Sequence, residues 1–388
     1  MKTNANDYVT RVFDTPGDID ARAWDALLVE QQEPNPFMRH AYLHAMHESG
    51  SAMPATGWTP RFVTLWRGEE LHAACAMYLK AHSYGEYVFD WAWASAYEQH
   101  GLAYYPKALV ASPFSPVPGA RLLARDAQAR SALVNAALHW CRTHEVSSLH
   151  VLFGTEVDVQ ACEANGLMLR HNVQFHWNNE GWTGFEAFLA SLAHDKRKKI
   201  RQERRKVGDA GITFRWSRGK DITAKDWDFF YRCYETTYWE HGNAPYLTRD
   251  FFDRMAREMP ANWLLFIAQR GGMPVGCSLI ALEEREGAKV AYGRYWGALE
   301  RVNCLHFDAC YYQPLEWCIE QGFDRFEGGA QGEHKMARAL MPVKTTSAHW
   351  LAHPQFADAV ERFLQREGQG IDRYLHHLEE RSPFRQSP

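Results

Sequence analysis

The chain has 388 residues, of which 46% are hydrophobic and 23% charged, and its net charge is −4. This length exceeds that of one ordinary hydrophobic core, so two domains are expected. The composition excludes a disordered or fibrous chain, and the negative net charge excludes a protein that coats nucleic acid with its whole surface. The N-terminal segment lacks the apolar stretch of a signal peptide, and no apolar run reaches the ~18–20 residues that span a bilayer. We therefore expect a soluble, cytoplasmic protein.

An internal repeat organises the sequence. Residues 62–94 align without a gap with residues 265–297, at an offset of 203. The same offset pairs Trp24-Asp25 with Trp227-Asp228, and both halves end in a His-Trp pair. Because the matches occur in the same order along the chain, they predict two copies of one α/β unit.

The first copy begins with an amphipathic helix over residues 24–33, and a second short helix follows Pro36. An apolar strand, a tight Arg-Gly turn and a strand of small residues follow over residues 62–79. Alternating aromatic side chains predict a third strand, which carries Tyr87, Phe89, Trp91 and Trp93. A helix over residues 129–144, a strand over residues 147–154 and a last strand ending at His176-Trp177 complete this copy.

The second copy repeats this order, with helices over residues 227–239 and 309–321 and a last strand that ends at His349-Trp350. Helices, an antiparallel meander and a strand–helix–strand return predict an α+β fold with mixed, mainly antiparallel sheets flanked by helices. This is also the element order of the GNAT fold. We place the first GNAT-like domain at residues 1–180, a basic connecting helix at 181–208 and the second domain at 209–388.

The connecting helix carries the strongest electrostatic feature of the sequence. A capping box of Thr183 and Glu186 marks its start, and eight basic residues lie between Lys196 and Lys206. On a helix the arginines of this run form one ridge, whose repulsion an anion would relieve. It either binds phosphates, such as those of a tRNA, or is a solvated helix face. The candidate phosphate-binding residues are Arg197, Lys198, Arg201 and Arg205.

Several longer segments carry a family resemblance. The second copy contains RYWG (294–297), LHFDACYY (305–312), FEGGAQGEHK (326–335) and SAHW (347–350), and the first contains FDWAWASAY (89–97), YYPK (104–107) and VQFHW (173–177). Together they resemble the FemAB-like family of bacterial proteins, which is related to the Fem-type peptidoglycan aminoacyltransferases. The resemblance implies a tandem GNAT-like fold and transfer of an activated acyl or aminoacyl group to an amine acceptor. Fem-type enzymes use aminoacyl-tRNA as donor and a cell-wall precursor as acceptor.

The sequence departs from acetyltransferases at the loop that binds pyrophosphate. The corresponding segments, SAYEQHGLAYY and LERVNCLHF, lack the glycines whose backbone amides cradle acetyl-CoA. The acyl donor is therefore left as aminoacyl-tRNA or acyl-CoA, with no other cofactor required. Two alternatives stay open: an acyl-CoA-dependent N-acetyltransferase, and a non-catalytic module that binds nucleic acid or a cell-wall precursor.

Candidate site residues concentrate in the second copy. Acyl transfer to an amine needs a base and donors for the developing oxyanion. The candidate catalytic residues are Glu333, His334, His306 and Tyr295, and which of the first three acts as base is left open. The candidate substrate-binding residues are Arg294, Lys335, Gln331, Asp90, Trp91 and Lys107. No metal is expected, because the sequence contains no motif with metal-ligand spacing.

Overall fold

The computed structural model describes residues 8–330 and 332–385, and the chain forms two compact units. Unit 1 consists of Met1–Asn172 and Lys344–Asp372, and unit 2 of Val173–Val343 and Arg373–Pro388. The units are therefore not the consecutive domains expected from the sequence. Residues 181–208 belong to unit 2, and residues 344–372 join unit 1.

Unit 1 contains two β-sheets. One has the order β1-β3-β4-β7, with bounds Val9–Phe13, Phe62–Arg67, Glu70–Cys75 and Leu123–Ala124. The other has the order β15-β8-β6-β5-β2, with bounds Met341–Leu351, Ser148–Val151, Lys107–Val110, Met77–Lys80 and Trp58–Pro60. In this second sheet β6 and β8 are parallel. The helices of this unit are α1 (Ala21–Val29), α2 (His40–Glu48), α3 (Trp91–Gln99), α4 (Ala127–Thr143), α5 (Glu156–Ala164) and the first part of α12 (Pro354–Glu379).

The predicted third strand of the first copy is wrong, because residues 91–99 form α3. Trp93 and Tyr97 lie four residues apart, so they share one helix face and pack with Phe356 and Val360 of α12. The aromatic residues at every second position from Tyr87 to Trp93 match the two-residue period of a strand, and this led to the wrong prediction. In its place, β6 pairs with β5.

Unit 2 is built on one sheet, with the order β10-β11-β12-β13-β14-β9. The strands span Ile212–Arg218, Trp263–Arg270, Met273–Arg285, Ala288–Ala298, Arg325–Ala330 and Met168–Asn178. Only the β13–β14 pair among these described strands is parallel. The helices are α6 (Phe185–Ser191), α7 (His194–Asp209), α8 (Ala224–Glu240), α9 (Arg249–Glu258), α10 (Leu305–Phe307) and α11 (Gln313–Glu320), with the second part of α12.

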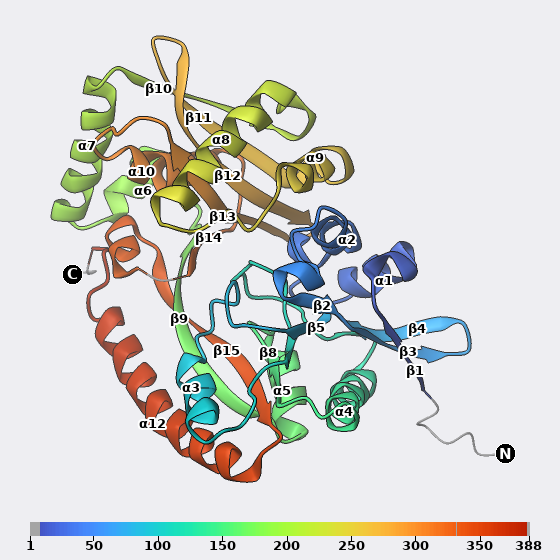
Figure 1. The fold of residues 1–388 in the computed structure, drawn as a ribbon. Helices are drawn as coiled ribbons and strands as arrows, with labels where there is room; N and C mark the ends of the chain where they lie inside the picture. Colours follow the sequence, from blue (N-terminus) through green and yellow to red (C-terminus); the bar gives the residue numbers. More distant parts are fainter. Residues whose placement is uncertain (1–7, 331, 386–388) are drawn as a thin grey trace. The chain divides into compact units, whose positions relative to one another are not determined.

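The last strand of each sequence copy completes the sheet of the other unit. The end of β9 pairs with β14 in unit 2, where Trp177 lies opposite Phe326. The end of β15 pairs with β8 in unit 1, where His349 lies opposite His150. In unit 1 the first part of β9 lies beside β15 (Figure 1), and Ser347 donates a hydrogen bond to the Arg170 carbonyl at 3.4 Å. This exchange explains why the predicted domain boundaries differ from the observed units.

The predicted basic helix is two helices, α6 and α7. Leu192 is extended at the break, and the Ala193 amide donates to the Pro383 carbonyl at 2.9 Å. Apolar side chains on both sides of the break are buried, namely Phe185, Phe188, Leu189, Leu192 and Ile200. The capping box of Thr183 is absent, because α6 begins after Gly184.

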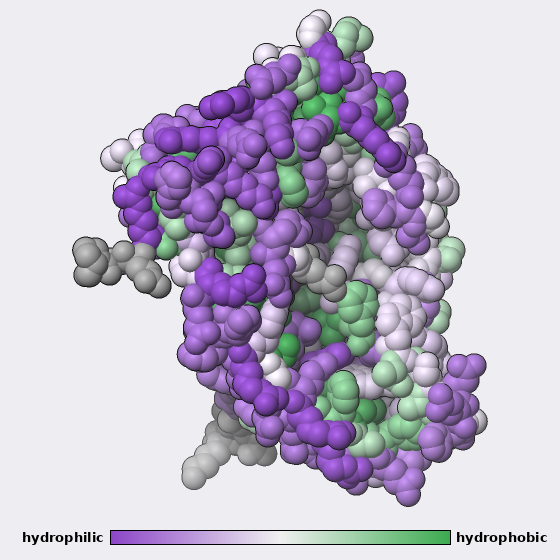
Figure 2. Space-filling view, turned by 90° about the vertical axis from the view of Figure 1, so that its left-hand side faces the viewer, coloured by the Kyte–Doolittle hydropathy of each residue, from purple (hydrophilic) through white to green (hydrophobic). Residues whose placement is uncertain are grey.

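No helix in the described part of the chain is both long and apolar enough to cross a bilayer. The face drawn in Figure 2 is mostly hydrophilic, and hydrophobic side chains gather in its lower half. α3 and α12 of unit 1 form an apolar groove, which is lined by Trp93, Ala96, Phe356, Val360 and Phe363.

Candidate active site

A small cavity of about 130 Å³ lies in unit 2, among β12, β13, β14 and the helix that begins at Leu305. Of the candidates from the sequence, Arg294, Tyr295 and His306 line it. Cys310 and Tyr311 also contribute to its wall. The structure thus brings together three candidate residues from two separate sequence motifs.

A β-bulge shapes the strand side of this cavity. In the β12–β13 pair, Leu279 lies opposite Tyr295 and Ile280 opposite Gly293, so Arg294 is the extra residue. Bulges redirect side chains and are frequent beside active sites. The Arg294 guanidinium lies 3.5 Å from the Tyr295 hydroxyl and 5.1 Å from the centroid of its ring.

A π-helical turn shapes the opposite wall. Asp308–Tyr312 forms this turn between α10 and α11, and it carries Cys310 and Tyr311. π-Turns inside helices are often found at functional sites. The Ser278 hydroxyl on β12 donates to the Ala309 carbonyl, which holds the turn against the sheet. Burial raises the pKa of the Cys310 thiol well above its usual range, so Cys310 is not a thiolate nucleophile.

His306 is a neutral imidazole at physiological pH. Burial is the main cause that lowers its pKa to about 4, followed by electrostatic repulsion from the His334 ring when that ring is protonated and from Arg338. Its ring lies 5.3 Å from the Trp296 ring and 5.9 Å from the Tyr311 ring, centroid to centroid. A neutral imidazole at the edge of a cavity can accept a proton from a reacting group.

Lys335 lies beneath the same cavity. Its ammonium group donates to the Gly329 carbonyl at 3.0 Å, and only 4% of the residue is exposed. Burial lowers its pKa to about 8. A Cβ added to Gly328, which lines the cavity, would overlap Leu340 Cδ2 at 2.5 Å and would lie in ordinary contact with Lys335 Cδ at 3.4 Å, so the packing of Leu340 favours a glycine here. His334 is next in the chain, and its Nε2 lies 3.4 Å from the Tyr311 hydroxyl.

A buried ion pair fixes the turn that carries His334 and Lys335. Arg338 donates to the His334 carbonyl at 2.7 Å and to the Glu203 carboxylate at 2.9 Å. Its guanidinium lies 3.7 Å from the centroid of the Phe307 ring. This pair was not predicted from the sequence. Glu203 could have been found because it lies on the buried stripe of α7, three residues after Ile200 and four before Val207.

Glu333 is placed differently from its neighbours. Its carboxylate accepts hydrogen bonds from the Tyr374 hydroxyl at 2.7 Å and from Arg381 at 3.2 Å, and both donors lower its pKa. It does not line the cavity. Gln331 lies outside the described residues.

A larger cavity, of about 550 Å³, adjoins the first in unit 2. The two share Trp296 and His306 in their walls. The larger one extends past the end of β13 and is also lined by Thr237, His241, Arg301 and Asn303. Its wall therefore includes residues of the segment LERVNCLHF (299–307), which lacks the glycines of a pyrophosphate loop.

The basic face of α7 is only partly neutralised by the protein. Arg201 pairs with Glu186, and Arg204 with Glu316 at 2.7 Å. Within the described chain no ion pair involves Arg197, Lys198 or Arg205. Lys198 and Arg205 are exposed, and Arg197 is half-buried.

The remaining candidates lie in unit 1. Asp90 and Lys107 are buried and form an ion pair with each other. Trp91 begins α3 and is 40% exposed.

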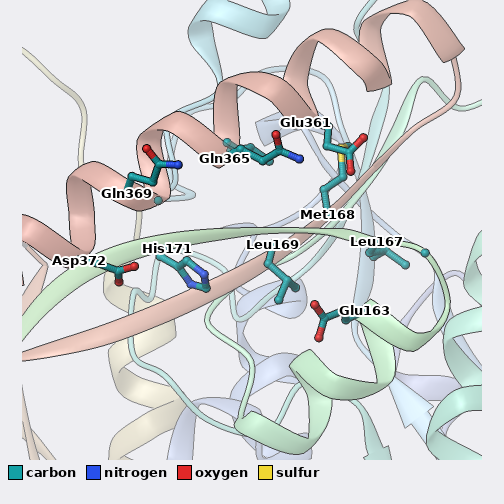
Figure 3. Close-up of a pocket in the computed structure, with 12 residues that line it drawn as sticks. Glu163, Leu167, Met168, Leu169, His171, Glu361, Gln365, Gln369 and Asp372 are labelled. Atoms are coloured by element: carbon teal, nitrogen blue, oxygen red, sulfur yellow. The ribbon is translucent and has the colours of Figure 1, made fainter.

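Figure 3 shows a separate hollow of unit 1, lined from α5, β9 and α12 by residues that include Glu163, His171 and Glu361. Asp372 at its edge is paired with Lys344 at 3.0 Å. None of the sequence candidates lies there.

The fold defines a class: mixed α+β units with mainly antiparallel sheets flanked by helices, as expected from the sequence. The chain belongs to the FemAB-like family, described as peptidoglycan biosynthesis/recognition, which matches residues 16–386. This confirms the family resemblance seen in the sequence.

Several solved structures share this fold at low sequence identity. The C-terminal domain of a putative lysylphosphatidylglycerol synthetase from Agrobacterium fabrum has a TM-score of 0.55 at 9% identity, with 89% of this chain and 96% of that chain covered. L-PGS from Bacillus licheniformis has a TM-score of 0.54 at 12% identity, with coverages of 89% and 97%. FemX has a TM-score of 0.53 at 10% identity, with coverages of 88% and 98%. No curated protein matches the sequence significantly.

Proposed function

We propose that unit 2 transfers an aminoacyl group from aminoacyl-tRNA to an amine acceptor at the small cavity beside the β13 bulge. The observation that carries this proposal is the small cavity, whose wall brings the His306 imidazole together with Tyr295 and Arg294. An amine attacks only as the free base, so the site needs a group that takes its proton at neutral pH.

In the proposed reaction the amine nitrogen attacks the ester carbonyl carbon of the donor. A C–N bond forms, and His306 accepts the proton that the nitrogen loses. Protonated Lys335 stabilises the negative charge on the carbonyl oxygen. When the ester C–O bond breaks, the tRNA hydroxyl oxygen leaves and takes a proton from the Tyr295 hydroxyl. No cofactor or metal takes part in these steps.

Other side chains bind or position the substrates in this proposal. Arg294, redirected by the bulge, binds an anionic group of the acceptor. His334 contacts Tyr311 and stays close to the reacting centre, whereas Glu333, held by Tyr374 and Arg381, orients the turn. The larger cavity, which meets the small one at His306, receives the end of the donor.

The exposed basic face of α7 binds the tRNA phosphates in this proposal. Three of its cations, Arg197, Lys198 and Arg205, form no ion pair within the described chain, and phosphate contacts of this kind make binding salt-dependent. Reversing Lys198 and Arg205 to Glu should weaken tRNA binding and flatten its salt dependence, as measured by filter binding.

The decisive test compares donors and a matched pair of histidine variants. We expect aminoacyl-tRNA to raise the melting temperature and to acylate a panel of amines, while CoA esters do neither. His306→Gln should slow single-turnover transfer by roughly 10²–10⁴-fold with donor binding retained, the range typical of a lost general base. His377→Gln, on the exposed face of α12, is the control and should transfer normally.

One alternative donor is favoured by a specific observation. The larger cavity is lined by residues of the segment 299–307, the counterpart of the pyrophosphate loop in the sequence, so an acyl-CoA-dependent enzyme would bind CoA there. Stabilisation and turnover with CoA esters but not with charged tRNA would replace the leading proposal with this one. Binding of tRNA without any turnover, unaffected by His306→Gln, would instead favour a non-catalytic module.

A further inference from the structure

Two buried lysines face each other in unit 1. Lys80 on β5 and Lys107 on β6 are register partners across an antiparallel pair, and neither side chain is exposed. Like charges directly opposite on neighbouring strands repel each other. A buried charge also needs a partner of opposite sign, so something must neutralise this pair.

The neutralising groups come from the segment between the two strands. Glu86 approaches Lys107 at 2.7 Å and Lys80 at 4.0 Å, and Asp90 also pairs with Lys107. The Ser83 hydroxyl accepts a hydrogen bond from Lys107 at 2.8 Å. Residues 81–90 contain no helix or strand, so the cations lie on the rigid sheet and the anions on an irregular cover.

This irregular segment, residues 81–90, contains an unsatisfied hydrogen-bond acceptor and a residue in an unfavourable backbone conformation. Glu86 Oε1 is buried and, within the described chain, accepts no hydrogen bond, although the residue is only 5% exposed. Tyr87 has a φ of 64°, a left-handed conformation that costs free energy in a residue with a Cβ. Tyr84 and Phe89 remain 57% and 51% exposed, so much of the apolar surface of the segment stays outside the core.

Other polar groups continue the network on the sheet side. The Tyr104 hydroxyl donates to Asp90 at 2.6 Å and lies 3.2 Å from His150, whose other ring nitrogen lies 2.7 Å from that of His349. Burial lowers the pKa of Lys80 to about 7 and raises that of Glu86 to about 7, so this ion pair is weakly held near neutral pH. Lys107 is thus bonded to three groups of the cover, whereas within the described chain Lys80 meets the cover through the Tyr84 carbonyl at 3.2 Å and the 4.0 Å contact with Glu86.

We propose that Lys80 and Lys107 form an anion site that takes a phosphate or diphosphate group of a ligand, and that Glu86 and Asp90 mask this site when the ligand is absent. Two ammonium groups side by side match the paired negative charges of a phosphate, which lysine binds as a point charge. The ligand displaces residues 81–90 outward and replaces their carboxylates. This inference goes beyond acyl transfer, because it assigns a ligand to unit 1 and is tested by binding alone.

The test uses the full-length chain and pyrophosphate or inorganic phosphate as the probe. To silence the second basic surface, all variants carry Lys198→Ala and Arg205→Ala. Titration calorimetry should show that Glu86→Gln, which removes one masking charge and keeps the shape, binds pyrophosphate roughly tenfold more tightly, or about 1.4 kcal/mol. Hydrogen exchange within residues 81–90 should rise when pyrophosphate is added.

Two further variants keep the result interpretable. The charge-balanced Lys80→Met/Glu86→Gln variant leaves Lys107 paired with Asp90 and should lose the gain in affinity. Glu163→Gln, which removes an equal charge from the exposed end of α5, should leave binding unchanged. If Glu86→Gln and Glu163→Gln have equal effects, or if exchange within residues 81–90 is unaltered by pyrophosphate, the proposed site does not exist.

Discussion

The turn that carries His334 and Lys335 should depend on the buried pair of Glu203 and Arg338. Arg338 is 2% exposed and Glu203 is 7% exposed, and the carboxylate also accepts the Tyr312 hydroxyl. Glu203→Leu therefore leaves a buried guanidinium without its counter-charge, and Arg338→Met leaves the carboxylate without its own. Loss of one partner of such a pair costs about 3–5 kcal/mol of the free energy of unfolding.

The matched experiment removes both charges. Glu203→Leu/Arg338→Met replaces the pair with apolar side chains of similar size, which is often neutral or stabilising. The His334 carbonyl then loses its 2.7 Å hydrogen bond, a cost of about 1–2 kcal/mol. We expect the double variant to be more stable than either single variant, with a coupling energy of about 3 kcal/mol.

Chemical denaturation at 25 °C measures all four free energies of unfolding. A coupling energy below about 0.5 kcal/mol, the level at which effects simply add, would refute the assignment of this pair as the anchor of the turn. A second readout concerns the site itself. If the double variant is stable yet the pKa of His306 is unchanged, Arg338 does not influence the imidazole as its position implies.

Three further results are expected. Gly297→Ala should lower the free energy of unfolding by about 3 kcal/mol or more, because the new methyl group would overlap the Cys233 carbonyl oxygen where β13 meets α8. Gly208→Ala, on the open face of α7, should raise the free energy of unfolding by about 0.5–1 kcal/mol in the same denaturation assay. Burial lowers the pKa of His176 to about 3 in the folded chain, whereas in the unfolded chain it stays near 6.5. Below pH 6.5 the unfolded chain therefore binds more protons, and the folded chain loses stability as the pH falls. His176→Asn should remove about 1.5–2 kcal/mol of the stability that is lost between pH 6.5 and 5. In the proposed reaction Lys335 acts protonated, so the transfer rate should fall as pH rises through about 8, and Lys335→Arg should move this fall to higher pH; an unshifted profile would contradict the role.

Local patterns were enough to predict most of the helices and strands. The Arg-Gly turn at Arg270 and the following strands form as the repeat indicated, because hydrophobic period and turn chemistry act over short distances. Residues 87–93 were wrongly predicted as a strand, because their aromatic side chains fit one face of a strand as well as one face of a helix. Burial of Trp93 and Tyr97 against α12 decides between them, and α12 is more than 250 residues further along the chain.

The candidate site shows the same division between local and distant information. Arg294, His306 and Lys335 stood out because each is a polar residue in an otherwise apolar or glycine-rich motif. Arg338 and Glu203 did not stand out, because each has other charged residues close by in the sequence. The pairing of Lys80 with Lys107 follows from strand register, which depends on contacts that a single sequence does not specify.

The exchange of β9 and β15 has a consequence for how the chain can be divided. A cut near residue 180 would leave each fragment without the strand that covers β8 or β14, and both fragments would expose an open sheet edge. The two copies therefore resemble a strand-swapped dimer that has been joined into one polypeptide. Such halves should be recovered only when produced together, as complementing fragments.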